Sequence, residues 1–124
     1  MILSIPFVGK TWPIFDTVFS LPHGERPTAV ICVNDYEAVR VFERLNYLNV
    51  RVPDDVSIIG CDNIVKELPS GVGLTTIAQP FEDIGEEAVR LFLRRKQKSE
   101  LSPSYVELPS KLVVRQSTIN ITPG

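Results

Sequence analysis

Hydrophobic positions along the chain fall into two patterns, short continuous runs and longer periodic stretches. Three runs, at residues 28–33 (TAVICV), 56–60 (VSIIG) and 74–78 (LTTIA), are rich in β-branched side chains. Runs of this kind are typical of strands that are buried on both faces of a parallel sheet. We therefore predict a strand in each of the three segments.

Two longer stretches have the hydrophobic period of an amphipathic helix. Residues 80–98 begin with acidic and end with basic side chains, an order that complements the helix dipole. A short helix is expected after Pro13, and residues 1–10 are expected to belong to the fold. Residues 104–108 (SYVEL) and 111–116 (KLVVRQ) are two further strand candidates. In residues 35–48, apolar side chains recur at helical spacing, namely Ala38, Val41, Phe42, Leu45 and Leu48.

The order of these elements predicts an α/β fold. Strands that alternate with helices through short links favour βαβ units around a parallel sheet. The 124 residues suffice for one domain with its own core, and 44% hydrophobic and 23% charged residues are ordinary for a globular protein. A net charge of −2 gives no electrostatic reason to expect nucleic-acid binding by this segment, and no apolar run is long enough for a membrane span. Cys32 and Cys61 are expected to be reduced thiols at or near strands.

Polar residues stand directly after two of the predicted strands. Asn34 and Asp35 follow the first strand, and Asp62 follows the second by way of Cys61. Ligands of open parallel sheets bind beyond the carboxyl ends of the strands, where Asn34 and Asp62 would share one edge. A carboxylate there suits sugar hydroxyls, because it accepts strongly from two donors. Asp35 is expected to cap the following helix, and for Asp62 a simple turn after Gly60 is an equal alternative.

No further motif indicates chemistry at a catalytic or metal site. The single histidine, His23, stands in a turn-like stretch without a second histidine to share a metal ion. The sequence has no nucleophile elbow, no CxxC pair and no HExxH motif. We therefore predict no catalytic residue, no metal site and no cofactor, and the protein is not expected to be an enzyme.

Four blocks of the sequence, taken together, resemble a known family. They are RPTAVICVND, VRVPDDVSIIGCDN, LTTIAQPFEDIGEEAVRLFL and LPSKLVVRQST, and they extend over residues 26–118. In this order and spacing they resemble the C-terminal part of LacI/GalR-type transcriptional regulators. The resemblance implies an α/β three-layer parallel-sheet sandwich of the periplasmic-binding-protein type I-like kind. Residues 1–124 would form the C-terminal lobe of the effector-binding domain, without the DNA-binding head and most of the N-terminal lobe.

The resemblance also implies which residues contact an effector. Asp62 matches a carboxylate that commonly binds the effector, and Asn34 matches a position that reaches it in sugar-responsive members. Phe81 matches a position where an aromatic or apolar side chain lines the cleft. Gln79 is a weaker candidate in the crossover to the other lobe. The effector would be a sugar, a sugar phosphate or a purine.

A dimer contact follows from the same resemblance. The helix over residues 35–48 resembles the family's contact between C-terminal lobes. Tyr36, Val39 and Glu43 are expected to lie off the core face of this helix and are the candidates for that contact; an ordinary exposed face is the alternative.

The implied protein is a cytoplasmic, homodimeric regulator that acts as a repressor. It binds operator DNA through a head not present in this chain and does not enter a membrane. A lobe of a periplasmic-type sugar-binding protein is the alternative. The crossover helix, residues 81–98, would pack on the missing lobe. Alone, the chain is expected to dimerise, swap this helix or fold it back onto its own sheet. Burying each large apolar side chain of its face stabilises by roughly 1.5–3 kcal/mol, and that face comprises Ile84, Ala88, Leu91 and Phe92.

Overall fold

The computed structural model describes residues 2–5, 12–97 and 104–120. Along this part of the chain the strands and helices follow one another in the order β1 (Ile2–Ile5), α1 (Trp12–Phe19), β2 (Ala29–Cys32), α2 (Asp35–Tyr47), β3 (Ser57–Cys61), β4 (Thr75–Ala78), α3 (Phe81–Gln97) and β5 (Lys111–Val113). The three predicted strands and the two long helices are confirmed with small shifts at their ends. Lys98, the last residue of the predicted crossover helix, lies outside the described residues.

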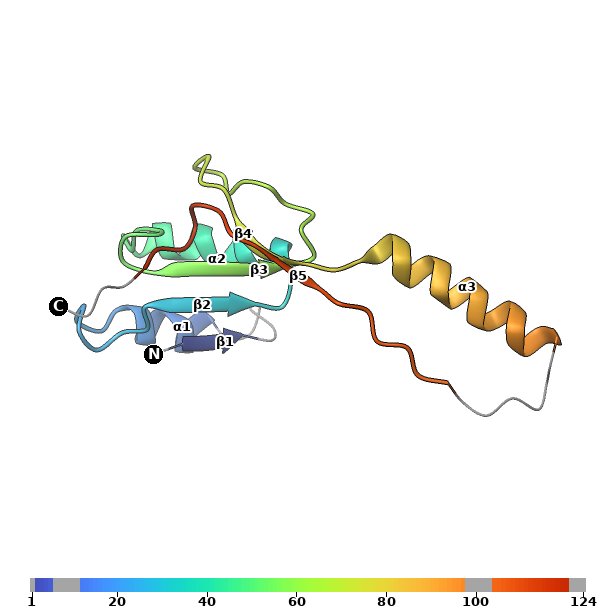
Figure 1. Cartoon of the computed structure of the whole chain (residues 1–124). Coiled ribbons are helices and arrows are strands. Elements are labelled where there is room, and N and C mark those ends of the chain that lie inside the picture. The colour runs from blue at the N-terminus through green and yellow to red at the C-terminus, as the bar shows by residue number, and fades with distance from the viewer. Residues whose placement is uncertain (1, 6–11, 98–103, 121–124) are drawn as a thin grey trace.

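The strands form a single sheet in the order β1-β2-β3-β4-β5. The first four strands are parallel, and β5 pairs antiparallel with β4. Their carboxyl ends therefore share one edge, and α3 extends away from that edge (Figure 1). The α/β class is confirmed, with a mixed sheet rather than a purely parallel one.

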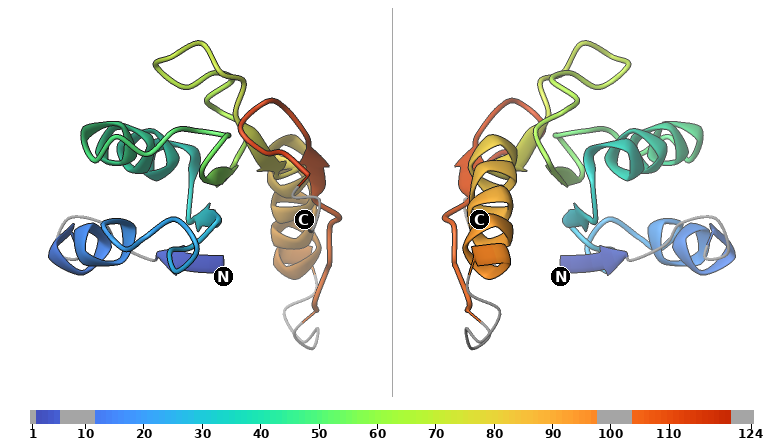
Figure 2. Two further views of the ribbon diagram at one scale, coloured as in Figure 1. Left: turned by 90° about the vertical axis from the view of Figure 1, so that its left-hand side faces the viewer. Right: turned by 90° about the vertical axis from the view of Figure 1, so that its right-hand side faces the viewer.

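Helices α1 and α2 lie on the same side of the sheet (Figure 2). Helix α1 connects β1 to β2, and α2 connects β2 to β3, so both connections move in the same direction across the sheet. Right-handed crossovers then place both helices on one face. The core lies between this face and the two helices, and its largest fully buried side chains include Phe19, Leu45, Ile58 and Leu74. Arg44 of α2 also joins Asp16 of α1 through a guanidinium–carboxylate pair.

The opposite face of the sheet is only partly covered. In β2 the side chains of Val30 and Cys32 are buried, whereas Ile31 is 37% exposed. Val33, which directly follows the strand, is 53% exposed. The expectation that this strand is buried on both faces is therefore wrong. No helix of the described residues lies over this second face, because α1 and α2 share the first.

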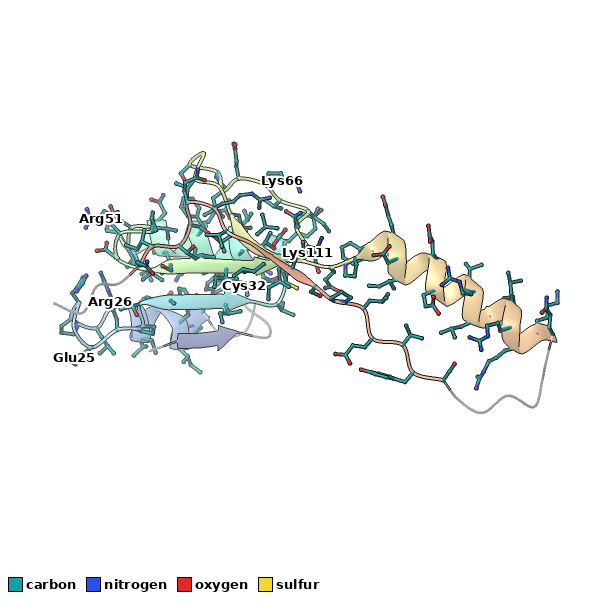
Figure 3. All side chains as sticks on the ribbon, in the orientation of Figure 1. Glu25, Arg26, Cys32, Arg51, Lys66 and Lys111 are labelled. Atoms are coloured by element: carbon teal, nitrogen blue, oxygen red, sulfur yellow. The ribbon has the colours of Figure 1, made fainter. Side chains whose placement is uncertain are left out.

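Helix α3 projects from the sheet and does not fold back onto it (Figure 1). None of its residues is buried, and its side chains stand apart from those of the sheet (Figure 3). The fold-back alternative is thus wrong for the single chain. Residues 104–108 do not form a strand, because the returning chain runs beside α3, away from any strand edge that could bond it. In the described part of the chain, no helix has the length and apolar character needed to cross a membrane.

Candidate effector site at the carboxyl ends of the strands

The turn after β3 places two successive residues in the left-handed region of backbone conformation. Asp62 has a φ of 103° and Asn63 a φ of 57°. Residues other than glycine rarely adopt positive φ, because this conformation costs free energy. It persists only where the surrounding structure holds the residue in place. The turn begins with a hydrogen bond from the Asp62 amide to the Ile77 carbonyl of β4, at 2.8 Å.

The carboxylate of Asp62 points to the crossover into α3. Its Oδ1 accepts a hydrogen bond of 2.7 Å from Nε2 of Gln79. Asp62 is half-buried, and the first residue of α3, Phe81, is 50% exposed. These side chains line one open hollow of about 350 Å³, together with Asn63, Pro80, Glu82 and Asp83. Three of the four expected effector residues therefore meet at one place.

Asn34 has a role that the sequence did not predict for it. It is the N-cap of α2, and its Oδ1 accepts a hydrogen bond of 2.8 Å from the amide of Glu37. It follows β2 at the same edge of the sheet but does not line the hollow at Asp62. Within the described residues its Nδ2 makes no hydrogen bond.

Asp35 is not the cap that the sequence indicated. It is the first residue of α2, and its side chain is buried. The carboxylate turns inward and accepts hydrogen bonds from the amides of Ile64 and Val65, at 2.7 and 3.0 Å, and from Oγ1 of Thr76 at 2.6 Å. The expectation failed because Asn34, one residue earlier, already bonds the free amide of the first turn.

A second set of contacts holds Asn63. Its Oδ1 accepts from Nη2 of Arg115, at 2.8 Å, and from Nζ of Lys66, at 3.0 Å. Arg115 also donates to the carbonyl of Leu74, at 2.6 Å. Arg115 lies 52 residues from Asn63 in the sequence, so no local pattern pointed to this contact.

The electrostatic character of the hollow is acidic. Three of its lining residues are Asp62, Glu82 and Asp83, and none of the lining residues is lysine or arginine. Carboxylates accept hydrogen bonds from hydroxyl and amino groups but repel anions. The arrangement therefore suits a neutral ligand rich in donors, with the Phe81 ring as an apolar wall.

The two cysteines are free, as expected, and neither indicates redox or metal chemistry. Burial, with smaller contributions from the nearby carboxylates of Glu37 and Asp35, raises the pKa of the Cys32 thiol to about 12. Burial also raises the pKa of Cys61. Within the described residues no cluster of side chains is suited to hold a metal ion.

The three expected dimer-contact residues of α2 differ in their surroundings. Tyr36 and Glu43 are exposed. Val39 is half-buried and packs against the core cluster, so its expected position off the core face is wrong. A side chain already in contact with the core has less surface to offer a partner.

Comparison with known proteins assigns the chain to a family. Residues 7–118 match the model of the periplasmic binding protein-like domain. The chain belongs to this family.

The curated relatives that the chain matches are transcriptional regulators. Over 105 residues the chain is 34% identical to the HTH-type transcriptional repressor PurR of Aliivibrio fischeri (strain MJ11), a match that covers 85% of this chain and 31% of that protein. It is 35% identical over 115 residues to the HTH-type transcriptional regulator DegA of Bacillus subtilis (strain 168), covering 85% of this chain and 34% of DegA. The chain thus spans about a third of the length of the curated relatives it matches.

A solved structure supports the same class. The LacI family transcriptional regulator from Lactobacillus casei with bound sucrose superposes with a TM-score of 0.64 at 28% identity, covering 85% of this chain and 38% of that one. The resemblance to the effector-binding part of LacI/GalR-type regulators is therefore confirmed.

Proposed function

We propose that this chain forms the C-terminal lobe of the effector-binding domain of a transcriptional regulator and that its hollow binds a neutral, sugar-like molecule. The observation that carries the proposal is the meeting of the Asp62 carboxylate, the Gln79 amide and the Phe81 ring around one hollow at the carboxyl ends of the strands. Open parallel sheets bind their ligands at this edge.

The chemistry of the three side chains fits a sugar. Asp62 accepts from hydroxyl groups, and the hydrogen bond from Gln79 fixes the direction of the carboxylate. Oε1 of Gln79 offers a further acceptor, and the exposed Phe81 ring offers an apolar surface to the apolar face of a sugar ring. Asn34, outside the hollow at the neighbouring strand end, would reach the part of the ligand that extends beyond the hollow, with its side-chain amide as donor.

The charge of the hollow selects among the effector classes. Its acidic lining favours an uncharged sugar over a sugar phosphate, because a phosphate would meet three carboxylates without a cation among the lining residues. A neutral purine is the competing ligand, since its ring nitrogens and amino groups also bond a carboxylate. The relative from Lactobacillus casei was solved with sucrose, which favours the sugar.

The remaining roles concern the whole regulator. We propose a cytoplasmic homodimer, with Tyr36 and Glu43 of α2 at the dimer contact and Val39 at its edge, and with operator DNA bound by a head outside these 124 residues. The helix α3 would pack on a second lobe. The relatives are named transcriptional regulators, so we propose that the ligand is bound and released without conversion.

Calorimetric titration of the native regulator with sucrose, glucose and adenine tests the proposal. We expect one sugar to bind, and Asp62→Ala to abolish that binding and the response of operator binding while the fold stays intact. Asp54→Ala is the matched control, because Asp54 is an exposed carboxylate at the opposite end of β3. Normal sugar binding by Asp62→Ala refutes the assignment of Asp62.

The second candidate function is that of a periplasmic-type binding protein. The description of the matching family, which refers to periplasmic binding proteins, favours it. Binding of the native protein to DNA fragments from its own genome separates the two functions. A regulator retains a specific fragment and releases it, or binds it more tightly, when the sugar is added, whereas a transport-type protein retains none.

A further inference from the structure

The buried carboxylate of Asp35 is the feature that effector binding by Asp62 does not by itself explain. Its side chain is 1% exposed, although aspartate is rarely buried without a partner that repays the loss of hydration. We infer that Asp35 is a positioning residue, which holds the turn of residues 62–65 so that the Asp62 carboxylate faces the ligand. The inference rests on the proposed function, because Asp62 is the proposed ligand residue.

Both oxygens of Asp35 are used to fix that turn. Oδ2 accepts from two successive amides, those of Ile64 and Val65, at 2.7 and 3.0 Å. Oδ1 accepts from Oγ1 of Thr76 in β4, at 2.6 Å, and this hydroxyl in turn accepts from the amide of Asn63 at 3.2 Å. Hydrogen bonds to a buried carboxylate are stronger than those between neutral groups. One side chain thus binds the turn directly and through Thr76.

The turn needs such support because of its backbone. Asp62 and Asn63 both have positive φ, and each such residue costs free energy unless its neighbours hold it. Ile64 and Val65 are the residues at which the chain leaves this conformation, and their amides are the ones that Asp35 binds. Without these bonds, we expect the turn to relax and the Asp62 carboxylate to leave its place beside Gln79.

The sheet is shaped to admit the carboxylate. Gly60 of β3 lies against Asp35, and a Cβ at this position would collide with Oδ1 and approach the Asp35 backbone to 3.3 Å. The side chain of Asp35 is also not needed to cap α2, because Asn34 already bonds the amide of Glu37. The inward turn of the carboxylate therefore serves the loop rather than its own helix.

Three variants separate positioning from general stability. Asp35→Ala removes all three hydrogen bonds, whereas Asp35→Asn keeps an oxygen for the two amides and can donate to Thr76 Oγ1. Thr76→Val removes the hydroxyl alone and is the milder variant if Asp35→Ala does not fold. Asp55→Ala is the matched control, because Asp55 also accepts a backbone amide, that of Arg51 at 2.9 Å, but precedes β3 at the end away from the turn.

The first readout needs no ligand. The side-chain amide of Gln79 donates to Asp62, so its proton and nitrogen resonances report where the Asp62 carboxylate lies, and Asp62→Ala defines the signal without that bond. We expect the Gln79 signal of folded Asp35→Ala and Thr76→Val to move toward that of Asp62→Ala. Asp35→Asn should stay near wild type and Asp55→Ala unchanged. A wild-type signal in folded Asp35→Ala and Thr76→Val overturns the inference.

The second readout is the affinity for whichever of sucrose and glucose binds the wild type. We expect a loss of about tenfold or more for Asp35→Ala, the order expected when a hydrogen bond to a charged group is lost, with affinity largely restored in Asp35→Asn. If neither sugar binds the wild type, the proposed function fails, while the Gln79 signal still decides whether Asp35 positions Asp62. If the sugar binds and Asp35→Ala binds it equally well, the positioning role fails and the proposed function stands.

Discussion

At the scale of single residues, Asp35 and Asp55 both accept hydrogen bonds from backbone amides, and they stabilise loops at opposite ends of β3. Asp35 supports the turn after the strand, whereas Asp55 organises the loop before it. Asp55 accepts from the amide and the guanidinium of Arg51, at 2.9 and 3.1 Å, and lies 3.6 Å from Arg26 Nη2. The hydrogen bonds from Arg51 lower the pKa of Asp55 from 3.8 to about 2.

This shift predicts how stability depends on pH. A carboxyl group whose pKa is lower in the folded state contributes stability above its unfolded pKa of 3.8, and that contribution is lost as the pH falls toward the folded pKa of about 2. We expect Asp55→Asn to lower the free energy of unfolding by about 1 kcal/mol at neutral pH, since water screens the exposed Arg51.

Urea unfolding of wild type and Asp55→Asn across the acid range tests this expectation. The difference between them should shrink as the pH falls from about 4 to about 2. Asp54→Asn serves as the control, because Asp54 is exposed and its ion pair with Arg51 is long, at 3.6 Å. A difference that stays constant across this range would show that the stabilisation does not come from the Asp55 charge.

What the sequence could reveal at this scale depended on distance along the chain. Asp62 was singled out as a candidate because its position just after a strand is a local feature. The role of Asp35 was not, because its donors lie 29, 30 and 41 residues away. Asn34 and Asp35 are both good N-cap residues, and the choice between them depended on the partners that the fold brings to Asp35.

At the scale of elements, the cap residue of α2 is also one of the proposed effector contacts. Asn34 is the last residue of the link between β2 and α2, and its Oδ1 accepts a hydrogen bond from an amide in the first turn of the helix. If this bond is its main structural role, Asn34→Ala should lower the free energy of unfolding by about 1 kcal/mol, and Asn34→Asp should leave it nearly unchanged.

Asn46→Ala is the matched control for that helix, since Asn46 is exposed within α2 and caps nothing. Chemical unfolding followed by circular dichroism gives the three free energies. Equal stability of Asn34→Ala and wild type would contradict the capping role. If sugar affinity falls in Asn34→Ala and also in Asn34→Asp, which retains the cap but lacks the amide donor, then Nδ2 contacts the ligand.

The elements also show where sequence patterns succeed and fail. Strands β2 to β5 and the two long helices were predicted, because hydrophobic period and strand length are local properties of the chain, whereas β1 was not predicted as a strand. The segment 104–108 has the alternation of a strand but runs beside α3, where no strand edge is available to bond it. Likewise β2 reads as buried on both faces, yet Ile31 is exposed because both crossovers place their helices on the other side.

At the scale of the whole molecule, the most unusual feature is the exposed helix α3. Apolar side chains on one face of the helix are largely exposed, among them Val89, Phe92 and Leu93. A hollow beside Gly85, where a Cβ would meet open space, lies within this face. Apolar surface of this extent on a single helix is typical of an interface rather than of a solvated surface.

We therefore predict that the chain of 124 residues, prepared alone, self-associates through α3, by pairing or by exchange of the helix. Burying each large apolar side chain contributes roughly 1.5–3 kcal/mol, which opposes the entropy lost on association. Val89→Asp, in the middle of the apolar face, should shift the equilibrium to the monomer. Arg94→Asp, on the polar side of the same helix, introduces the larger change in charge and should leave association intact.

Sedimentation equilibrium over a wide range of protein concentration distinguishes the outcomes. A concentration-dependent dimer that Val89→Asp dissociates and Arg94→Asp retains places α3 in the interface. A dimer that neither variant dissociates, but that Tyr36→Asp does, places the contact on α2 instead. A wild-type chain that stays monomeric with α3 solvated at every concentration contradicts the prediction, because the exposed apolar face would then be stable in water without any partner.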